Sequence, residues 1–174
     1  MEFTVLDTDR GTALTGTPWP EYPRPSLRRD SFVNLNGGWD FAVGDPAQLP
    51  EHFDRTIRVP FPPESKLSGI GQVFPEEQAL YYRKNFTLPE EFVGRRVLLH
   101  FGAVDQEAAV FLNGKKLGIH TGGYQAFTFE IPDALERENT LLVRVRDRLS
   151  ARILPYGKQT RKRGGMWYTP VSGI

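Results

Sequence analysis

The sequence predicts an all-β protein, built as an antiparallel β-sandwich or jelly roll. Short runs of β-branched and aromatic residues recur along the chain, with turn residues between them. No stretch has the periodicity of a long amphipathic helix, which argues against an α/β core. The central stretch, residues 101–129, contains two strands joined by Asn113-Gly114, a dipeptide that tolerates positive φ at both centres of a hairpin turn. We expect this stretch to lie in the middle of the sandwich.

Size and composition limit the alternatives. The chain has 174 residues, 39% of them hydrophobic, which suits one folded domain with a full core. A net charge of +1 indicates neither a nucleic-acid nor a membrane partner. The absence of cysteine excludes disulfides and thiolate metal sites and is compatible with a reducing compartment. The first residues lack the apolar segment of a signal peptide, so we expect a cytoplasmic protein.

The first third of the chain alternates between extended and turn-rich segments. Residues 1–29 are rich in proline and predict an extended arm on the surface, before a sandwich domain over residues 30–174. A turn at 36–38 leads into the strand 39–41, and a short strand over 56–59 ends at a proline. The proline- and glycine-rich run 60–71 can be neither strand nor helix. It is a binding loop or a surface connection that crosses the sandwich.

Further strands follow up to the basic segment near the end. We expect strands at 80–88, 96–101, 104–112, 115–120, 126–131 and 140–147, with a short helical turn at 133–138. In the strand 140–147, one face carries Leu141, Val143 and Val145, and we expect the other face to be exposed to solvent. Segment 148–165 is basic, with one tyrosine inside it, and favours a solvated or interdomain loop over a nucleic-acid site. The chain stops on an apolar residue just past a glycine, which we interpret as a cut inside a longer protein.

Few residues suggest catalysis. His52, His100 and His120 lie far apart without ligand spacing, so we expect no metal and no cofactor. No Gly-x-Ser-x-Gly run or phosphate loop is present. The adjacent acids Glu76-Glu77 and Glu90-Glu91 sit beside turns and should be solvated. Asp105 and Glu107 fall on one face of one predicted strand, as a polar sheet edge would. We therefore predict no catalytic residue in this chain.

Aromatic side chains on predicted loops offer another kind of site. Sugars stack their C–H faces on aromatic rings and accept planar hydrogen bonds from polar side chains. Aromatic residues in sandwich proteins also fill cores, so each candidate has both interpretations open. The candidates are Phe61, Tyr81, Tyr82, Tyr124, Trp167 and Tyr168.

Several motifs in a fixed order identify a family. They are Leu35–Phe41 (LNGGWDF), Val59–Ser65 (VPFPPES), Tyr81–Phe86 (YYRKNF), Leu99–Asp105 (LHFGAVD), Val110–Gly114 (VFLNG), Gly122–Phe127 (GGYQAF) and Trp167–Ile174 (WYTPVSGI). With these motifs the chain resembles the N-terminal sugar-binding domain of glycoside hydrolase family 2, which includes β-galactosidases, β-glucuronidases and β-mannosidases. The resemblance covers residues 28–174.

The resemblance implies a galactose-binding-like jelly roll followed by an immunoglobulin-like domain and a TIM barrel that carries both catalytic glutamates. This chain would then be the non-catalytic domain of a retaining exo-β-glycosidase of carbohydrate metabolism, with a β-glycoside as ligand. It would support the barrel and shape the rim of its active site. The family continues past Ser-Gly-Ile into a last strand of this domain, which would be truncated here. The sheet edge would then be left open or patched by a neighbouring chain, which makes a homo-oligomer a further candidate. A freestanding carbohydrate-binding module and a scaffold domain without ligand are the competing interpretations.

The resemblance also points to rim residues. In some relatives, loop residues soon after the strand that ends here at Asp147, and just before the Ser-Gly-Ile motif, reach the active site. Asp147 is therefore the first candidate and Trp167 the second. The further candidates are Tyr168, Phe61 and Glu64. Glucuronidases carry an acidic residue where this chain has Met166-Trp167-Tyr168, which argues against a glucuronide and leaves a β-galactoside or another β-glycoside open.

Overall fold

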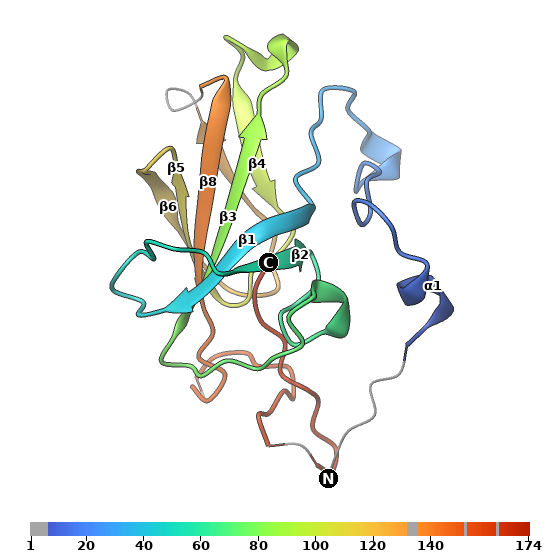
Figure 1. Cartoon of the computed structure of the whole chain (residues 1–174), viewed down its shortest axis with the longest axis vertical. Coiled ribbons are helices and arrows are strands. Elements are labelled where there is room, and N and C mark those ends of the chain that lie inside the picture. Colours follow the sequence, from blue (N-terminus) through green and yellow to red (C-terminus); the bar gives the residue numbers. More distant parts are fainter. Residues whose placement is uncertain (1–6, 132–135, 152, 163) are drawn as a thin grey trace.

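The computed structural model describes residues 7–131, 136–151, 153–162 and 164–174, and confirms the predicted all-β antiparallel sandwich (Figure 1). Within these residues, six strands form one sheet in the order β2-β1-β3-β8-β5-β6, and β4 pairs with β7 in a second sheet. The strands are β1 Gly37–Gly44, β2 Arg55–Val59, β3 Ala79–Thr87, β4 Val97–Phe101, β5 Glu107–Leu112, β6 Lys115–Thr121, β7 Phe127–Ile131 and β8 Glu138–Arg146. All pairings are antiparallel.

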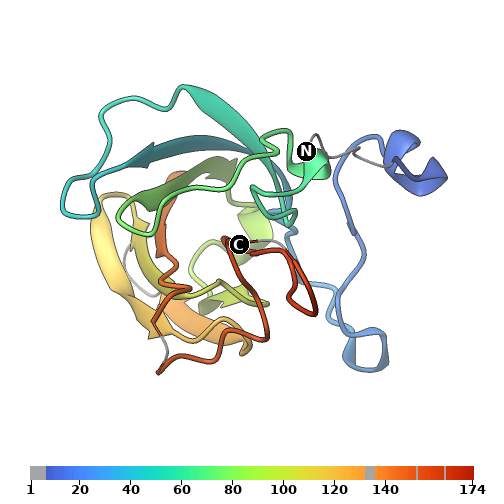
Figure 2. The same ribbon diagram turned by 90° about the horizontal axis from the view of Figure 1, so that it is seen from below.

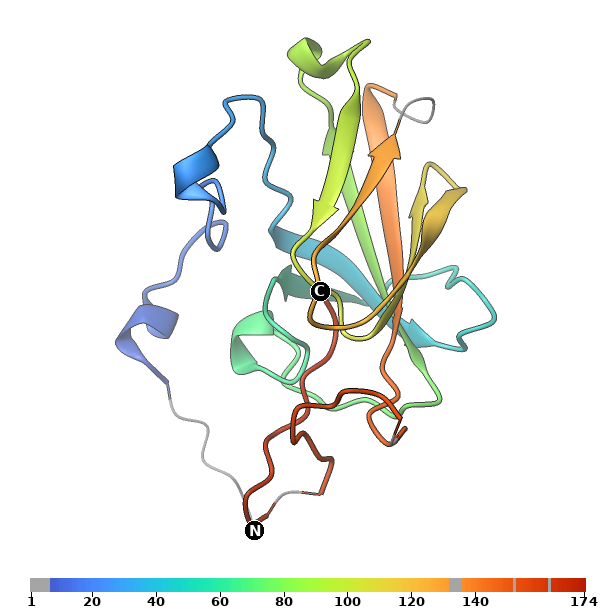
Figure 3. The same ribbon diagram turned by 180° about the vertical axis from the view of Figure 1, so that it is seen from behind.

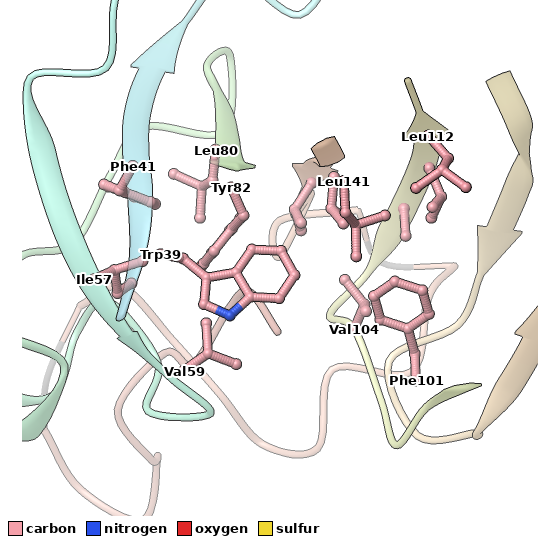
Figure 4. Close-up of a cluster of buried hydrophobic side chains, with 14 of the residues drawn as sticks. Trp39, Phe41, Ile57, Val59, Leu80, Tyr82, Phe101, Val104, Leu112 and Leu141 are labelled. Atoms are coloured by element: carbon pink, nitrogen blue, oxygen red, sulfur yellow. The ribbon is translucent and has the colours of Figure 1, made fainter. Parts of the chain in front are cut away.

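The core lies between the two sheets and follows from strand alternation. Every second residue of a strand points to the same side, so the inward positions of β8 are Leu141, Val143 and Val145, all at most 1% exposed. Figure 4 shows Leu141 facing Phe101 and Val104, and all five residues belong to one buried cluster. The same face carries Trp39, Phe41, Ile57, Val59, Leu80, Tyr82, Ala108, Val110 and Leu112. Burial of this apolar surface is the main stabilising contribution to the sandwich.

The outer face of the six-stranded sheet is also covered at its centre. Tyr81 is fully buried there, and its hydroxyl donates to the backbone oxygens of Asp45 and Gln48 at 2.7 and 2.8 Å. Tyr82, its neighbour on β3, is buried on the inner face. The interpretation of Tyr81 and Tyr82 as exposed sugar-binding rings is therefore wrong. The loop between β1 and β2 folds over the sheet and encloses the outward ring.

The central hairpin forms as predicted, but its first strand is shorter. Asn113 and Gly114 have φ values of 49° and 77°, which is the turn that this dipeptide favours. Strand β5 begins only at Glu107. Asp105 instead pairs through its backbone with Gly173, at N–O distances of 2.9 and 3.0 Å. The prediction that Asp105 and Glu107 share one face of one strand is therefore wrong.

Short helical turns lie outside the sheets. They are α1 Asp9–Thr12, η1 Pro25–Leu27, η2 Lys66–Ser68 and η3 Glu90–Phe92. The turn η2 lies inside the run 60–71, for which no helix was expected, and Ser65 caps it by accepting from the backbone of Ser68. The predicted turn at 133–138 falls largely outside the described residues. No helix in the described part of the chain is long and apolar enough to cross a membrane.

The N-terminal arm runs along one side of the sandwich, as the views in Figures 1 and 2 agree. The amide of Asn36 donates to the backbone oxygen of Pro18 at 3.1 Å, and the amide of Asn34 donates to that of Trp19 at 2.7 Å. The Trp19 ring packs on Phe61, with 5.3 Å between ring centroids. The arm is thus held against the loop that follows β2.

Candidate functional site

Asp147 is placed by the register of β8. It follows the last strand residue and continues the inward positions of Leu141, Val143 and Val145. Its side chain therefore points toward the lower end of the core, where the segment 147–174 and the loop after β2 come together (Figures 1 and 3). The residue is only 8% exposed, and no described residue donates a hydrogen bond to its carboxylate.

Among the described residues, three further carboxylates and one guanidinium act on Asp147 through their charges. We call Asp147, Asp105, Glu64, Glu76 and Arg161 the acidic cluster. The pKa of Asp147 is raised to about 7, first by burial and then by the charge of Asp105. Arg161 opposes this effect, while Glu76 and Glu64 add to it. A carboxylate held without donors among other acids keeps its proton to an unusually high pH.

Asp105 lies beside Asp147 because the last residues of the chain hold its backbone. Burial raises the pKa of its carboxyl, and a hydrogen bond from the Gln159 side chain partly offsets that rise. Gly123 packs against the same carboxylate, since a Cβ on Gly123 would stand 2.5 Å from an Asp105 oxygen. The loop 122–126 and the segment around Gln159 thus enclose Asp105.

Glu64 joins the cluster from the loop after β2. Its carboxylate accepts from the hydroxyl of Ser172 at 2.7 Å and from the Ser172 backbone at 3.2 Å. Burial nevertheless raises the pKa of Glu64 above its ordinary value. The Tyr82 hydroxyl is buried, and burial, with the nearby charge of Glu64, raises the pKa of that phenol. The charge of Glu64 therefore acts on both Asp147 and Tyr82.

Glu76 and Arg161 close the cluster on the solvent side. Glu76 accepts from the backbone of Ser150 at 2.9 Å and from Arg161 Nε at 3.1 Å. Burial alone would raise the pKa of Glu76, but the hydrogen bonds from Ser150 and Arg161 bring it below its usual value. Arg161 also donates to the backbone oxygen of Phe74. The expectation that Glu76 is merely solvated is wrong, because the segment 148–161 folds back over it.

The structure separates the predicted site residues into three places. Glu64 and Asp147 come together in the acidic cluster. Trp167 and Tyr168 are 47% and 64% exposed on the final segment. Phe61 lies apart, against the arm. Asp105, Glu76 and Arg161 were not predicted for the site, because each reaches it through a loop whose course no local pattern indicates.

The chemistry of the cluster is that of a hydrogen-bond acceptor. No group of three acidic or histidine side chains in the described ranges is arranged to hold a metal ion. Asp147 offers carboxylate oxygens to which no described residue donates, and buried charged acceptors bind hydroxyl or amide donors strongly. A ligand with several hydroxyl groups fits that requirement.

Comparison with known proteins agrees with this fold. Curated relatives include a β-glucuronidase of Bacteroides fragilis, 30% identical over 137 residues, which are 78% of this chain and 19% of that protein. A β-galactosidase of Thermoanaerobacter pseudethanolicus is 38% identical over 80 residues, covering 44% of this chain and 11% of the relative. The chain therefore spans about a fifth or less of these proteins.

Solved structures of similar proteins have the same fold over most of this chain. The β-glucuronidase of Bifidobacterium dentium, complexed with coumarin-3-O-glucuronide, superposes with a TM-score of 0.55 at 30% identity, over 69% of this chain and 21% of that one. A β-D-mannosidase of Dictyoglomus thermophilum reaches a TM-score of 0.56 at 26% identity, over 68% of this chain and 16% of that one. Residues 68–164 match the family described as "Glycosyl hydrolase 2 galactose-binding domain-like". The chain belongs to this family of galactose-binding-like domains of glycoside hydrolase family 2.

Proposed function

We propose that this chain is the non-catalytic N-terminal domain of a retaining exo-β-glycosidase of carbohydrate metabolism. It supports a catalytic barrel that another part of the same protein supplies, and it contributes to the rim of the active site. The observation that carries the proposal is Asp147, a carboxylate that is 8% exposed and accepts no hydrogen bond from the described residues. A substrate at the rim supplies the missing donors.

The energetics favour a hydroxyl-rich ligand at this position. A buried carboxylate without donors is costly, and each charged hydrogen bond contributes about 1.5–3 kcal/mol. Sugar hydroxyls are donors of the right kind, and the names of the relatives are those of β-glycosidases. The stretch Met166-Trp167-Tyr168 departs from the acidic residue that the resemblance implies for glucuronidases, and this departure supports a β-galactoside or another β-glycoside as the substrate.

The proposal is tested in the protein that joins this chain to its following domains. Asp147→Asn keeps the shape of the side chain and removes its charge. We expect kcat/KM for nitrophenyl β-galactoside, or for whichever nitrophenyl β-glycoside the protein cleaves, to fall about 10- to 100-fold. Asp54→Asn, at an exposed aspartate beside β2, is the control and should leave kcat/KM unchanged. A change of less than about twofold in Asp147→Asn would show that Asp147 does not reach the substrate.

A further inference from the structure

Three aromatic residues of the final segment and Tyr124 of the loop after β6 gather next to the acidic cluster. The rings of Tyr156 and Trp167 lie 6.5 Å apart between centroids. The Tyr168 backbone donates to the oxygen of Lys158 at 2.9 Å, which brings this residue to the same turn. The Tyr124 hydroxyl packs against this turn as well, because a Cβ on Gly157 would stand 2.6 Å from it.

These rings face solvent to an unusual degree. Tyr124, Trp167 and Tyr168 are 60%, 47% and 64% exposed. A group of exposed aromatic rings on one surface marks a binding region more often than chance exposure does. Gln159 connects this surface to the acidic cluster, since its side chain bonds Asp105 and also accepts from the backbone of Val171 at 2.6 Å.

The same segment has a one-sided charge. Residues 148–174 contain six basic residues and no acidic one, whereas the whole chain has a net charge of +1. Arg161 turns inward to Glu76, but Lys158 and Lys162 are exposed, and the backbone of Lys158 bonds that of Tyr168. We call Tyr124, Tyr156, Trp167, Tyr168, Lys158 and Lys162 the aromatic–basic surface.

We propose that the aromatic–basic surface binds the leaving-group side of the substrate and favours a ring that carries an anionic substituent such as a carboxylate. This inference rests on the proposed function, which puts the acidic cluster at the rim beside the sugar. Aromatic side chains stack on flat rings, and exposed ammonium groups attract a nearby anion. The acidic cluster then contacts the sugar, while the adjoining surface contacts the group that leaves.

The test compares two leaving groups of nearly equal shape, para-carboxyphenyl and para-carbamoylphenyl, on the β-glycoside that the multidomain protein cleaves. The double substitution Lys158→Gln and Lys162→Gln should lower kcat/KM for the carboxyphenyl substrate about fivefold and for the carbamoylphenyl substrate less than about twofold. Each effect compares variant with wild type on one substrate, so intrinsic leaving-group reactivity cancels. Lys115→Gln, an exposed lysine in the β5–β6 hairpin, is the control and should change neither value.

Added salt gives a second readout, because exposed charges are screened over about 8–10 Å at moderate ionic strength. In 0.5 M salt the screening length lies between about 3 and 10 Å. The loss of kcat/KM that the two lysine substitutions cause on the carboxyphenyl substrate should therefore become smaller. Equal losses on both substrates, or no loss on either, overturn the inference. If Asp147→Asn lowers kcat/KM on both substrates while the lysine variant affects the two substrates equally, only this inference fails.

If Asp147→Asn leaves kcat/KM unchanged, the proposed function fails. A multidomain protein that cleaves neither substrate contradicts both the proposed function and this inference.

Discussion

At the residue scale, the environment of Asp147 links protonation to stability. The pKa of this carboxyl rises from 3.8 to about 7 on folding, chiefly through burial. Between these pH values the folded state holds a proton that the unfolded state has released. The stabilising contribution of this group to the free energy of unfolding is therefore fully present below about pH 4. It is lost as the pH rises through about 7.

Asp147→Asn should remove this pH dependence. An uncharged amide of the same shape has no proton to release, so the variant should gain stability relative to wild type as pH rises. We expect the difference in unfolding free energy to grow by about 1–4 kcal/mol between pH 4.5 and pH 8. Urea unfolding at the two pH values measures it, with Asp54→Asn as the control. A difference that does not depend on pH contradicts the environment described for Asp147.

Some of the site could be predicted residue by residue, and the rest could not. Asp147 continues the alternation of Leu141, Val143 and Val145, so its inward direction follows from local sequence. Alternation alone does not show what covers the opposite face, which is why both interpretations of Tyr81 stayed open until its burial was seen. Arg161 reaches Glu76 across 85 residues of chain, and no local pattern reports such a contact.

At the element scale, the segment Ser172-Gly173-Ile174 closes the lower end of the sandwich. Its backbone pairs with Asp105, and its serine binds Glu64. Gly173 has a φ of 93°, a conformation that residues with a Cβ rarely adopt. A Cβ there would also collide with the Tyr82 hydroxyl and stand 3.2 Å from Pro63. The glycine thus allows the segment to approach the core closely enough to order the acidic cluster.

Gly173→Ala should therefore destabilise the fold. Overpacking at a rigid site costs about 1–3 kcal/mol, and the unfavourable φ adds to it. Gly102→Ala is a matched control, since a Cβ on Gly102 meets no atom within 4 Å and its φ lies outside the left-handed region. Urea unfolding should show a loss for Gly173→Ala and a change within about 0.5 kcal/mol for Gly102→Ala. Equal stability of the two variants would mean that the final segment is not packed as described.

At the scale of the whole molecule, the sandwich could be predicted better than the site. The alternation of apolar residues in strands and the turn at Asn113-Gly114 depend only on neighbouring residues. The all-β class can therefore be predicted from the sequence. The order β2-β1-β3-β8-β5-β6 places β8 between β3 and β5, and this depends on contacts between distant residues. The acidic cluster depends on the same long-range arrangement, because it forms where loops from both sheets meet below β8.

The sandwich brings Asp147, a buried carboxylate to which no described residue donates, to the end of the molecule where Tyr124, Trp167 and Tyr168 are exposed. The structure of the multidomain protein with a bound sugar-lactone inhibitor tests this account most directly. We predict a carboxylate oxygen of Asp147 within about 3 Å of a sugar hydroxyl. A sugar bound in the barrel with no contact to Asp147, either direct or through one bridging water, would contradict the account.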